Sequence, residues 1–182
     1  VVYPTGAMKD YESRFWLPFK GVTKPVYAIP GNHDWYDALE GFVATFFKPD
    51  AARLAMRARI AADGGVSSTT DARIEEFITR AGFLRQQYGV ATGAQDGPFF
   101  QVQTPAFALI AVDTGVLRAI DREQMTWLRA ALDASRGKMV MAILGHLIFA
   151  GGHAVARGSS EFMEVRDLLR AEKFYIEIVG LA

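Results

Sequence analysis

Cysteine is absent from the 182-residue chain, which excludes disulfide bonds, thiolate metal sites and cysteine nucleophiles. Net charge is absent too, because 20 Lys and Arg residues balance 20 Asp and Glu residues, so no overall field favours nucleic acid or an anionic membrane as a partner. No apolar run approaches the roughly 18 residues of a membrane-spanning helix. The chain begins with Val1 and shows no signal peptide, so its localisation, cytoplasmic or exported, stays open.

Several catalytic signatures are also missing. The chain has no Gly-x-Ser-x-Gly elbow of a serine hydrolase, no Walker A motif and no dinucleotide fingerprint. The Asp-Thr-Gly sequence at 113–115 imitates an aspartic protease, but that chemistry needs two such carboxylates in an all-β setting. Only one copy is present, so the aspartic protease is a disfavoured alternative that pepstatin-type inhibition would revive.

The composition is that of a globular protein, with 51% hydrophobic and 22% charged residues. Its length favours one domain over residues 1–182. Residues 48–90 carry no evident chemistry and are predicted to be a helical insertion. It has an Ala- and Arg-rich helix over 51–62 and a second helix that Asp71 caps and Gly82 stops.

The periodicity of apolar residues predicts an α/β protein. Strands are predicted at 26–29, 98–103, 107–112, 139–144 and 174–179. Helices are predicted over 7–19, from residue 34 to about 48, from a capping box at Asp121 and around 162–169. The second and third strands are predicted to form a hairpin. The later alternation of strand and helix predicts parallel crossovers, and the apolar run at 139–144 predicts a strand buried on both faces.

All three histidines follow predicted strand ends. Asn32, His33 and Asp34 come directly after the strand 26–29, His146 follows the strand 139–144, and His153 lies in the next loop. Imidazole nitrogens and an amide oxygen can bind a divalent metal, although a complete site needs further carboxylates or histidines. The alternative at this point is an ordinary turn in which Asp34 caps a helix.

The sequence Gly-Asn-His-Asp at 31–34 after a strand, with a later strand ending in Gly-His at 145–146, resembles the calcineurin-like metallophosphoesterases. The purple-acid-phosphatase-like branch of that family is one candidate. Residues 1–4, 112–115, 120–128 and 145–152 fall in the family's order, so the resemblance covers most of the chain outside 48–90. It implies two facing mixed β-sheets flanked by helices, an αββα four-layer sandwich that is incomplete in this chain.

The resemblance also implies hydrolysis of a phosphate ester by in-line attack of a metal-bridging hydroxide, with two metal ions that are Mn, Fe or Zn. Asn32 and His146 would ligate one metal. His33 would face the phosphate as a catalytic residue, and Asp34 would orient and polarise it.

The same resemblance places His153 and Arg157 at the mouth of the site, where they would meet the substrate; the other interpretation is that both are ordinary loop residues. The substrate class, whether monoester, diester, nucleotide or phosphoprotein, stays open.

Two elements of the family pattern are missing. There is no upstream Asp-x-His with a bridging Asp, and the last predicted strand reaches Gly180 without a following histidine motif. We therefore expect the chain to be part of a longer protein, to supply ligands for about one metal, and to be inactive by itself. The alternative is a phosphoesterase fold kept as a catalytically inactive binding module.

Overall fold

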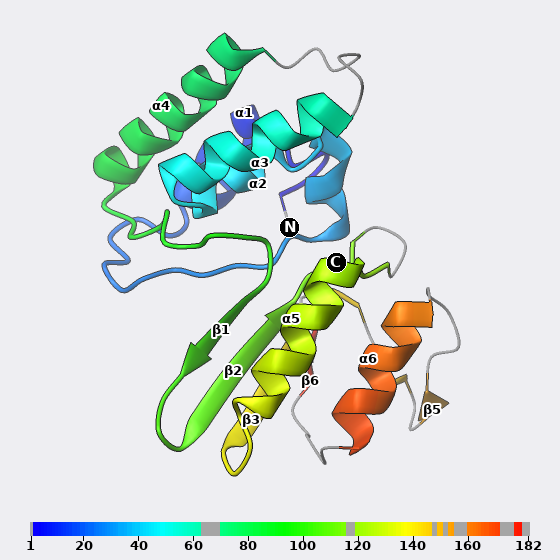
Figure 1. Cartoon of the computed structure of the whole chain (residues 1–182). Helices are drawn as coiled ribbons and strands as arrows, with labels where there is room; N and C mark the ends of the chain where they lie inside the picture. The colour runs from blue at the N-terminus through cyan, green and yellow to red at the C-terminus, as the bar shows by residue number, and fades with distance from the viewer. Residues whose placement is uncertain are drawn as a thin grey trace. The chain divides into compact units, whose positions relative to one another are not determined.

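The chain divides into two compact units, which are Val1–Pro98 and Phe99–Ala182, and each is described by itself (Figure 1). The computed structural model describes residues 2–62, 70–115, 119–146, 149–150, 153–154, 160–171 and 177–179. The prediction of one domain over residues 1–182 stays a prediction.

Unit 1 is helical in its described part. Its elements are α1 (Met8–Tyr11), the π-helical turn η1 (Glu12–Trp16), the 3-10 helix η2 (Asn32–Asp37), α2 (Glu40–Phe46), α3 (Pro49–Ala62) and α4 (Asp71–Tyr88). The prediction of a helix over 7–19 is confirmed over α1 and η1. Helices α3 and α4 belong to the core of this unit, since Met56, Ile74 and Leu84 are buried in one cluster with Trp16 and Phe42.

The predicted strand at 26–29 is wrong. The segment is extended, but it joins no sheet in the described structure. Val26 N donates to the Ala91 carbonyl at 2.8 Å, and the next bonds on that edge run to a side chain. The Gln95 amide accepts from Ala28 N at 2.7 Å and donates to Ala28 O at 2.9 Å. A side-chain amide therefore occupies the place that a second main chain would hold in a β-ladder.

The predicted single helix after residue 34 is interrupted. Ala38 and Leu39 adopt left-handed conformations, with φ of 50° and 60°, and separate η2 from α2. Such a conformation costs roughly 1–2 kcal/mol in a non-glycine residue. Leu39 is buried in the core, which is worth about 1.5–3 kcal/mol and offsets that cost.

The bounds of the helix predicted from Asp71 to Gly82 are also wrong. Thr70 is the N-cap, because its hydroxyl accepts from Arg73 N. The helix runs on to Tyr88, where Gly89 ends it with a φ of +62°. Gly82 is tolerated inside α4, where a side chain at its position would meet nothing within 4 Å.

Unit 2 mixes helices and strands. It contains β1 (Phe100–Gln103), β2 (Phe107–Val112), α5 (Arg122–Asp133), β3 (Met139–Leu144), β4 (Phe149–Ala150), β5 (His153–Ala154), α6 (Ser160–Ala171) and β6 (Glu177–Val179). One sheet has the order β1-β2-β3-β6, and β4 and β5 form a two-stranded antiparallel sheet. Strands β1 and β2 form the predicted hairpin, whereas β2, β3 and β6 run parallel, so the α/β class and its parallel crossovers are confirmed.

Helices α5 and α6 form the core of unit 2 with β2 and β3 (Figure 1). Asp121 caps α5 as predicted, since its carboxylate accepts from Gln124 N at 2.7 Å. The prediction that 139–144 is buried on both faces is wrong at Met139, which is 68% exposed. Burial alternates along β3, because residues 140, 142 and 144 belong to the core cluster of the two helices and their neighbours do not. No helix in the described ranges is both long and apolar enough to cross a membrane.

Candidate functional site

The polar turn at residues 31–34 is closed by two reciprocal hydrogen bonds. Asp34 N donates to the Gly31 carbonyl at 3.1 Å, and Gly31 N donates to Asp34 Oδ2 at 2.8 Å. Asp34 therefore satisfies the start of η2 from its third position rather than from the cap. The local sequence is enough to form this turn, and it places Asn32 and His33 at the start of the helix.

Asp34 ties the turn to two other segments of unit 1. Its carboxylate is 2% exposed, and Oδ1 accepts from the Tyr11 hydroxyl at 2.8 Å and from Val2 N at 3.3 Å. Burial, and then the charge of Asp34, hold the pKa of Tyr11 well above its usual value. These bonds fix the turn to the segments that carry Val2 and Tyr11.

The segment Val2–Gly6 lies directly on this turn. A Cβ atom at Gly6 would stand 2.5 Å from the Asp34 Cα, and Gly6 has a φ of +67°. Only glycine meets both demands without strain. The backbone of this segment is closed by Gly6 N, which donates to the Val2 carbonyl at 2.7 Å.

His33 takes its orientation from that segment. Its Nδ1 lies 2.7 Å from the Pro4 carbonyl oxygen, which can only accept, so Nδ1 carries the hydrogen. A bond from Nδ1 to Asp34 is therefore not formed, and the predicted orienting partner is replaced by the Pro4 carbonyl. Nε2 makes no hydrogen bond within the described ranges, and a neutral ring would present its lone pair there.

Asn32 carries an unsatisfied atom. Its Oδ1 is buried and accepts no hydrogen bond from the described residues. Buried amide oxygens nearly always have a partner, so an orphaned one calls for an explanation such as an unseen water or ion. A hard or borderline metal ion would satisfy this oxygen, so the residue fits the predicted ligand role.

His146 lies in unit 2, just past the carboxyl end of β3. The register pairs Val112 of β2 with Leu144 of β3, so the residues that follow the two strands emerge side by side. Thr114 Oγ1 and His146 Nδ1 are 2.6 Å apart, and Thr114 is almost fully buried. This contact takes up Nδ1 and fixes the ring, as partners of metal-binding imidazoles do.

A buried network holds the loop beside His146. The Gln124 side chain accepts from Asp113 N and donates to Asp113 O, both at 2.8 Å, while Asp113 Oδ1 accepts from Gly115 N at 2.9 Å. Sequence reasoning missed Gln124 and Thr114 as supporting residues. Their signal was a polar residue on the apolar stripe of α5 and a hydroxyl two residues after the end of a strand.

The other predicted site residues are less defined. His153 lies in the short strand β5, where its backbone pairs with Ala150, and Arg157 lies outside the described residues. Asn32, His33 and Asp34 are thus brought together in unit 1, and His146 has its own supported position in unit 2. Among the described residues no three His, Asp or Glu side chains form a metal-binding group, and the prediction of two metals stays a prediction.

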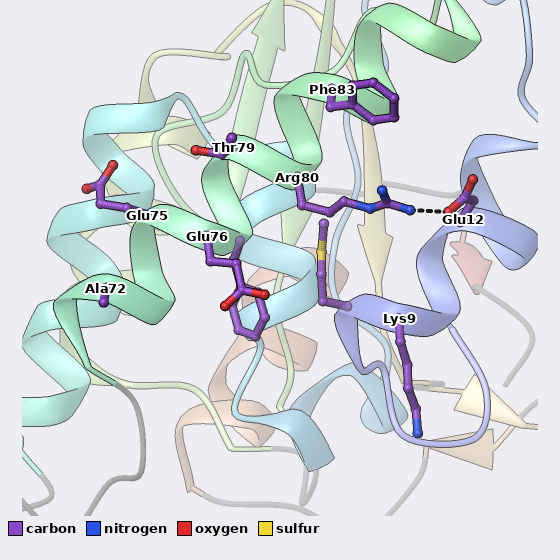
Figure 2. Close-up of a pocket in the computed structure, with 10 residues that line it drawn as sticks. Lys9, Glu12, Ala72, Glu75, Glu76, Thr79, Arg80 and Phe83 are labelled. Atoms are coloured by element: carbon purple, nitrogen blue, oxygen red, sulfur yellow. Dashed lines mark hydrogen bonds and ion pairs between the residues drawn. The ribbon is translucent and has the colours of Figure 1, made fainter.

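Unit 1 also contains a separate groove, whose side chains are less suited to catalysis than those of the turn at 31–34. A groove of about 810 Å³ lies between α4 and the segment of α1 and η1. Figure 2 shows Arg80 reaching across it to Glu12, with which it forms an ion pair. Glu75 is paired with Arg53, so the groove's carboxylates are largely neutralised within the unit. No histidine lines this groove.

None of the family models, curated proteins or solved structures with which the chain was compared matches it.

Proposed function

We propose that the chain is part of a metal-dependent phosphate-ester hydrolase of the calcineurin-like metallophosphoesterase type. The observation that carries the proposal is the pair at the start of η2. Asn32 has a buried, orphaned Oδ1, and its neighbour His33 has Nδ1 held by a backbone carbonyl and Nε2 without a partner in the described chain. A ligand atom next to an oriented acid or base is the arrangement that metal-assisted hydrolysis requires.

In this proposal Asn32 and His146 each contribute a metal ligand, and two ions of Mn, Fe or Zn are bound by the natural protein. When bound, the ions would supply a water of lowered pKa and positive charge for the phosphoryl oxygens. As an imidazolium, with Nδ1–H still on the Pro4 carbonyl, His33 would donate a hydrogen bond from Nε2 to the phosphoryl group; it would then pass that proton to the leaving oxygen and become the neutral ring. Thr114 orients His146, and Asp34 and Pro4 hold His33 in place through the turn. The proposed fold is the four-layer sandwich, to which the sheet β1-β2-β3-β6 would contribute one of the facing sheets.

The test is hydrolysis of p-nitrophenyl phosphate and bis(p-nitrophenyl) phosphate with added Mn²⁺ by the natural full-length protein. We expect His33→Asn to lower kcat by roughly 10²–10⁴, the usual contribution of a general acid. Asn32→Ala should raise the Mn²⁺ concentration needed for half activity. Asp96→Asn, an exposed site in unit 1, is the control and should change neither quantity. No hydrolysis, or undiminished hydrolysis after His33→Asn, would refute the catalytic proposal and favour an inactive binding module.

A further inference from the structure

His33 lies between two tyrosine rings. The centroid of the Tyr3 ring is 4.1 Å from that of the imidazole, with the planes tilted by 38°. The Tyr36 ring meets the same imidazole edge-on at 4.9 Å. The Tyr36 separation is that of an attractive edge-to-face pair, and the Tyr3 ring lies closer still, so the three side chains form one aromatic cluster, defined here as Tyr3, His33 and Tyr36.

Both tyrosines are held by short local connections rather than by burial. Tyr3 belongs to the segment Val2–Gly6, which is bonded to Asp34 and to His33 through its backbone. Tyr36 is on η2, three residues after His33. The backbone that carries each ring is therefore held beside the imidazole before any ligand arrives, which lowers the entropic cost of binding one.

The rings also remain open to solvent. Tyr3 is 43% and Tyr36 is 57% exposed, whereas Tyr11 of the same unit is 1% exposed. Exposed tyrosines offer a flat apolar surface with few rotamers to freeze, and planar rings of ligands stack on such surfaces. A ring stacked on either tyrosine would be one aromatic layer from His33. A phosphoryl group attached to that ring directly, or through a short link, would then be held near the imidazole of His33.

We propose that Tyr3 and Tyr36 determine substrate specificity by binding a planar aromatic ring in the alcohol part of the phosphate ester. The inference rests on the proposed function for the phosphoryl group. It narrows the substrate class to aryl phosphates and other esters with a ring close to phosphorus, and it disfavours esters of aliphatic alcohols. Stacking uses the π-face that every aromatic ring has, so the recognised feature is the ring itself.

The test uses non-hydrolysable probes, so that it does not depend on catalysis. The natural full-length protein is titrated with phenylphosphonate and with methylphosphonate in the presence of Mn²⁺, and the imidazole signal of His33 is followed by NMR. We expect phenylphosphonate to bind about tenfold more tightly than methylphosphonate, and we expect Tyr3→Leu with Tyr36→Leu to remove that preference. Tyr36→Phe, which keeps the ring, should retain the preference.

The matched control is Phe83→Leu, since Phe83 on α4 is an aromatic residue of similar exposure, 55%, in the same unit. It should leave both affinities unchanged. Equal binding of the two phosphonates by the unmodified chain, or no binding of either, would overturn the inference. A clear phenyl preference in a protein that hydrolyses no phosphate ester would refute the proposed function and leave ring recognition standing.

Discussion

The bond between Tyr11 and Asp34 offers a quantitative test of how the turn is held. Asp34 accepts from the Tyr11 hydroxyl, Gly31 N and Val2 N in an almost fully buried position. Hydrogen bonds to a charged group contribute about 1.5–3 kcal/mol each, and their contributions do not add fully. Asp34→Ala also leaves the Tyr11 hydroxyl buried without a partner. We therefore expect the free energy of unfolding of unit 1 to fall by about 3–5 kcal/mol.

The individual contribution of the Tyr11–Asp34 bond comes from a double-mutant cycle. Asp34→Asn keeps the shape but turns one acceptor into a donor, and we expect a loss of about 2 kcal/mol. Tyr11→Phe removes the hydroxyl alone and should cost about 1–2 kcal/mol. Because the two side chains contact each other, the double variant should lose less than the sum, with a coupling of about 1–2 kcal/mol.

The assay is urea unfolding followed by tryptophan fluorescence. The chain has three tryptophans, of which Trp16 and Trp35 are in unit 1 and Trp127 is in unit 2. In a Trp127→Phe background the signal reports on unit 1. A loss below 1 kcal/mol for Asp34→Ala, or strict additivity in the cycle, would show that the carboxylate does not anchor the turn.

Three further predictions follow from the same contacts. Because the pKa of Tyr11 in the folded chain is above its usual 10.0, the folded state holds that proton more tightly than the unfolded state. Stability should therefore fall as the pH rises above about 10, and Tyr11→Phe should weaken this fall in alkaline denaturation curves; an unchanged curve would refute the assignment. Under the proposed function, in which His146 is a metal ligand, Thr114→Val should weaken metal binding by about 10–100-fold in isothermal titration, while Thr114→Ser should retain it. Equal affinities of the two variants would argue against an orienting role for Thr114. Gly6→Ala should destabilise unit 1 by more than about 2 kcal/mol in thermal unfolding, because its new Cβ would meet backbone at 2.5 Å. Gly21→Ala is the control, with a φ of +82° and nothing within 4 Å, and should cost only about 1–2 kcal/mol. Similar losses for the two variants would refute the close contact at Gly6.

Local patterns predicted those elements whose stability is decided locally. Helix α5 has an N-cap at Asp121 and an apolar stripe of Met125, Leu128 and Leu132, and all of these signals lie within twelve residues. The bounds of β3 follow in the same way from an uninterrupted apolar run ended by Gly145. The parallel crossovers then follow because the connections between β2 and β3 and between β3 and β6 are long enough to contain a helix.

The errors lie where a distant residue decides the outcome. Gln95 replaces a neighbouring strand for the segment at 26–29, and it is 67 positions from Ala28, so no window around that segment contains the cause. Ala38 and Leu39 are not residue types that predict a left-handed backbone. The conformation is stabilised because Leu39 is buried among residues of other helices. In α4 the local signal was present but misleading. Gly82 predicted the end of the helix, yet the helix continues through it, and the next turn buries Leu84.

The turn of the candidate site also combines features that the local sequence predicts with features that distant residues decide. The types of its side chains could be predicted from the sequence, since an amide, an imidazole and a carboxylate after an extended segment are informative by themselves. Their partners could not, because Pro4 and Tyr11 reach the turn only through the fold.

This difference changes what each residue of the turn is for. A carboxylate next to an imidazole in sequence suggests a catalytic pair, but consecutive side chains at the start of a 3-10 helix point in different directions. Asp34 points into unit 1 and fixes the turn, so its charge stabilises the scaffold, while His33 points outward with its tautomer set by a backbone carbonyl. A carbonyl holds the ring without adding a negative charge beside it, which suits the anionic substrate of the proposed function. The segment Val2–Gly6 is therefore as much a part of the candidate site as the turn itself, since it supplies the carbonyl that orients His33, the amide that binds Asp34 and the Tyr3 ring that covers the imidazole.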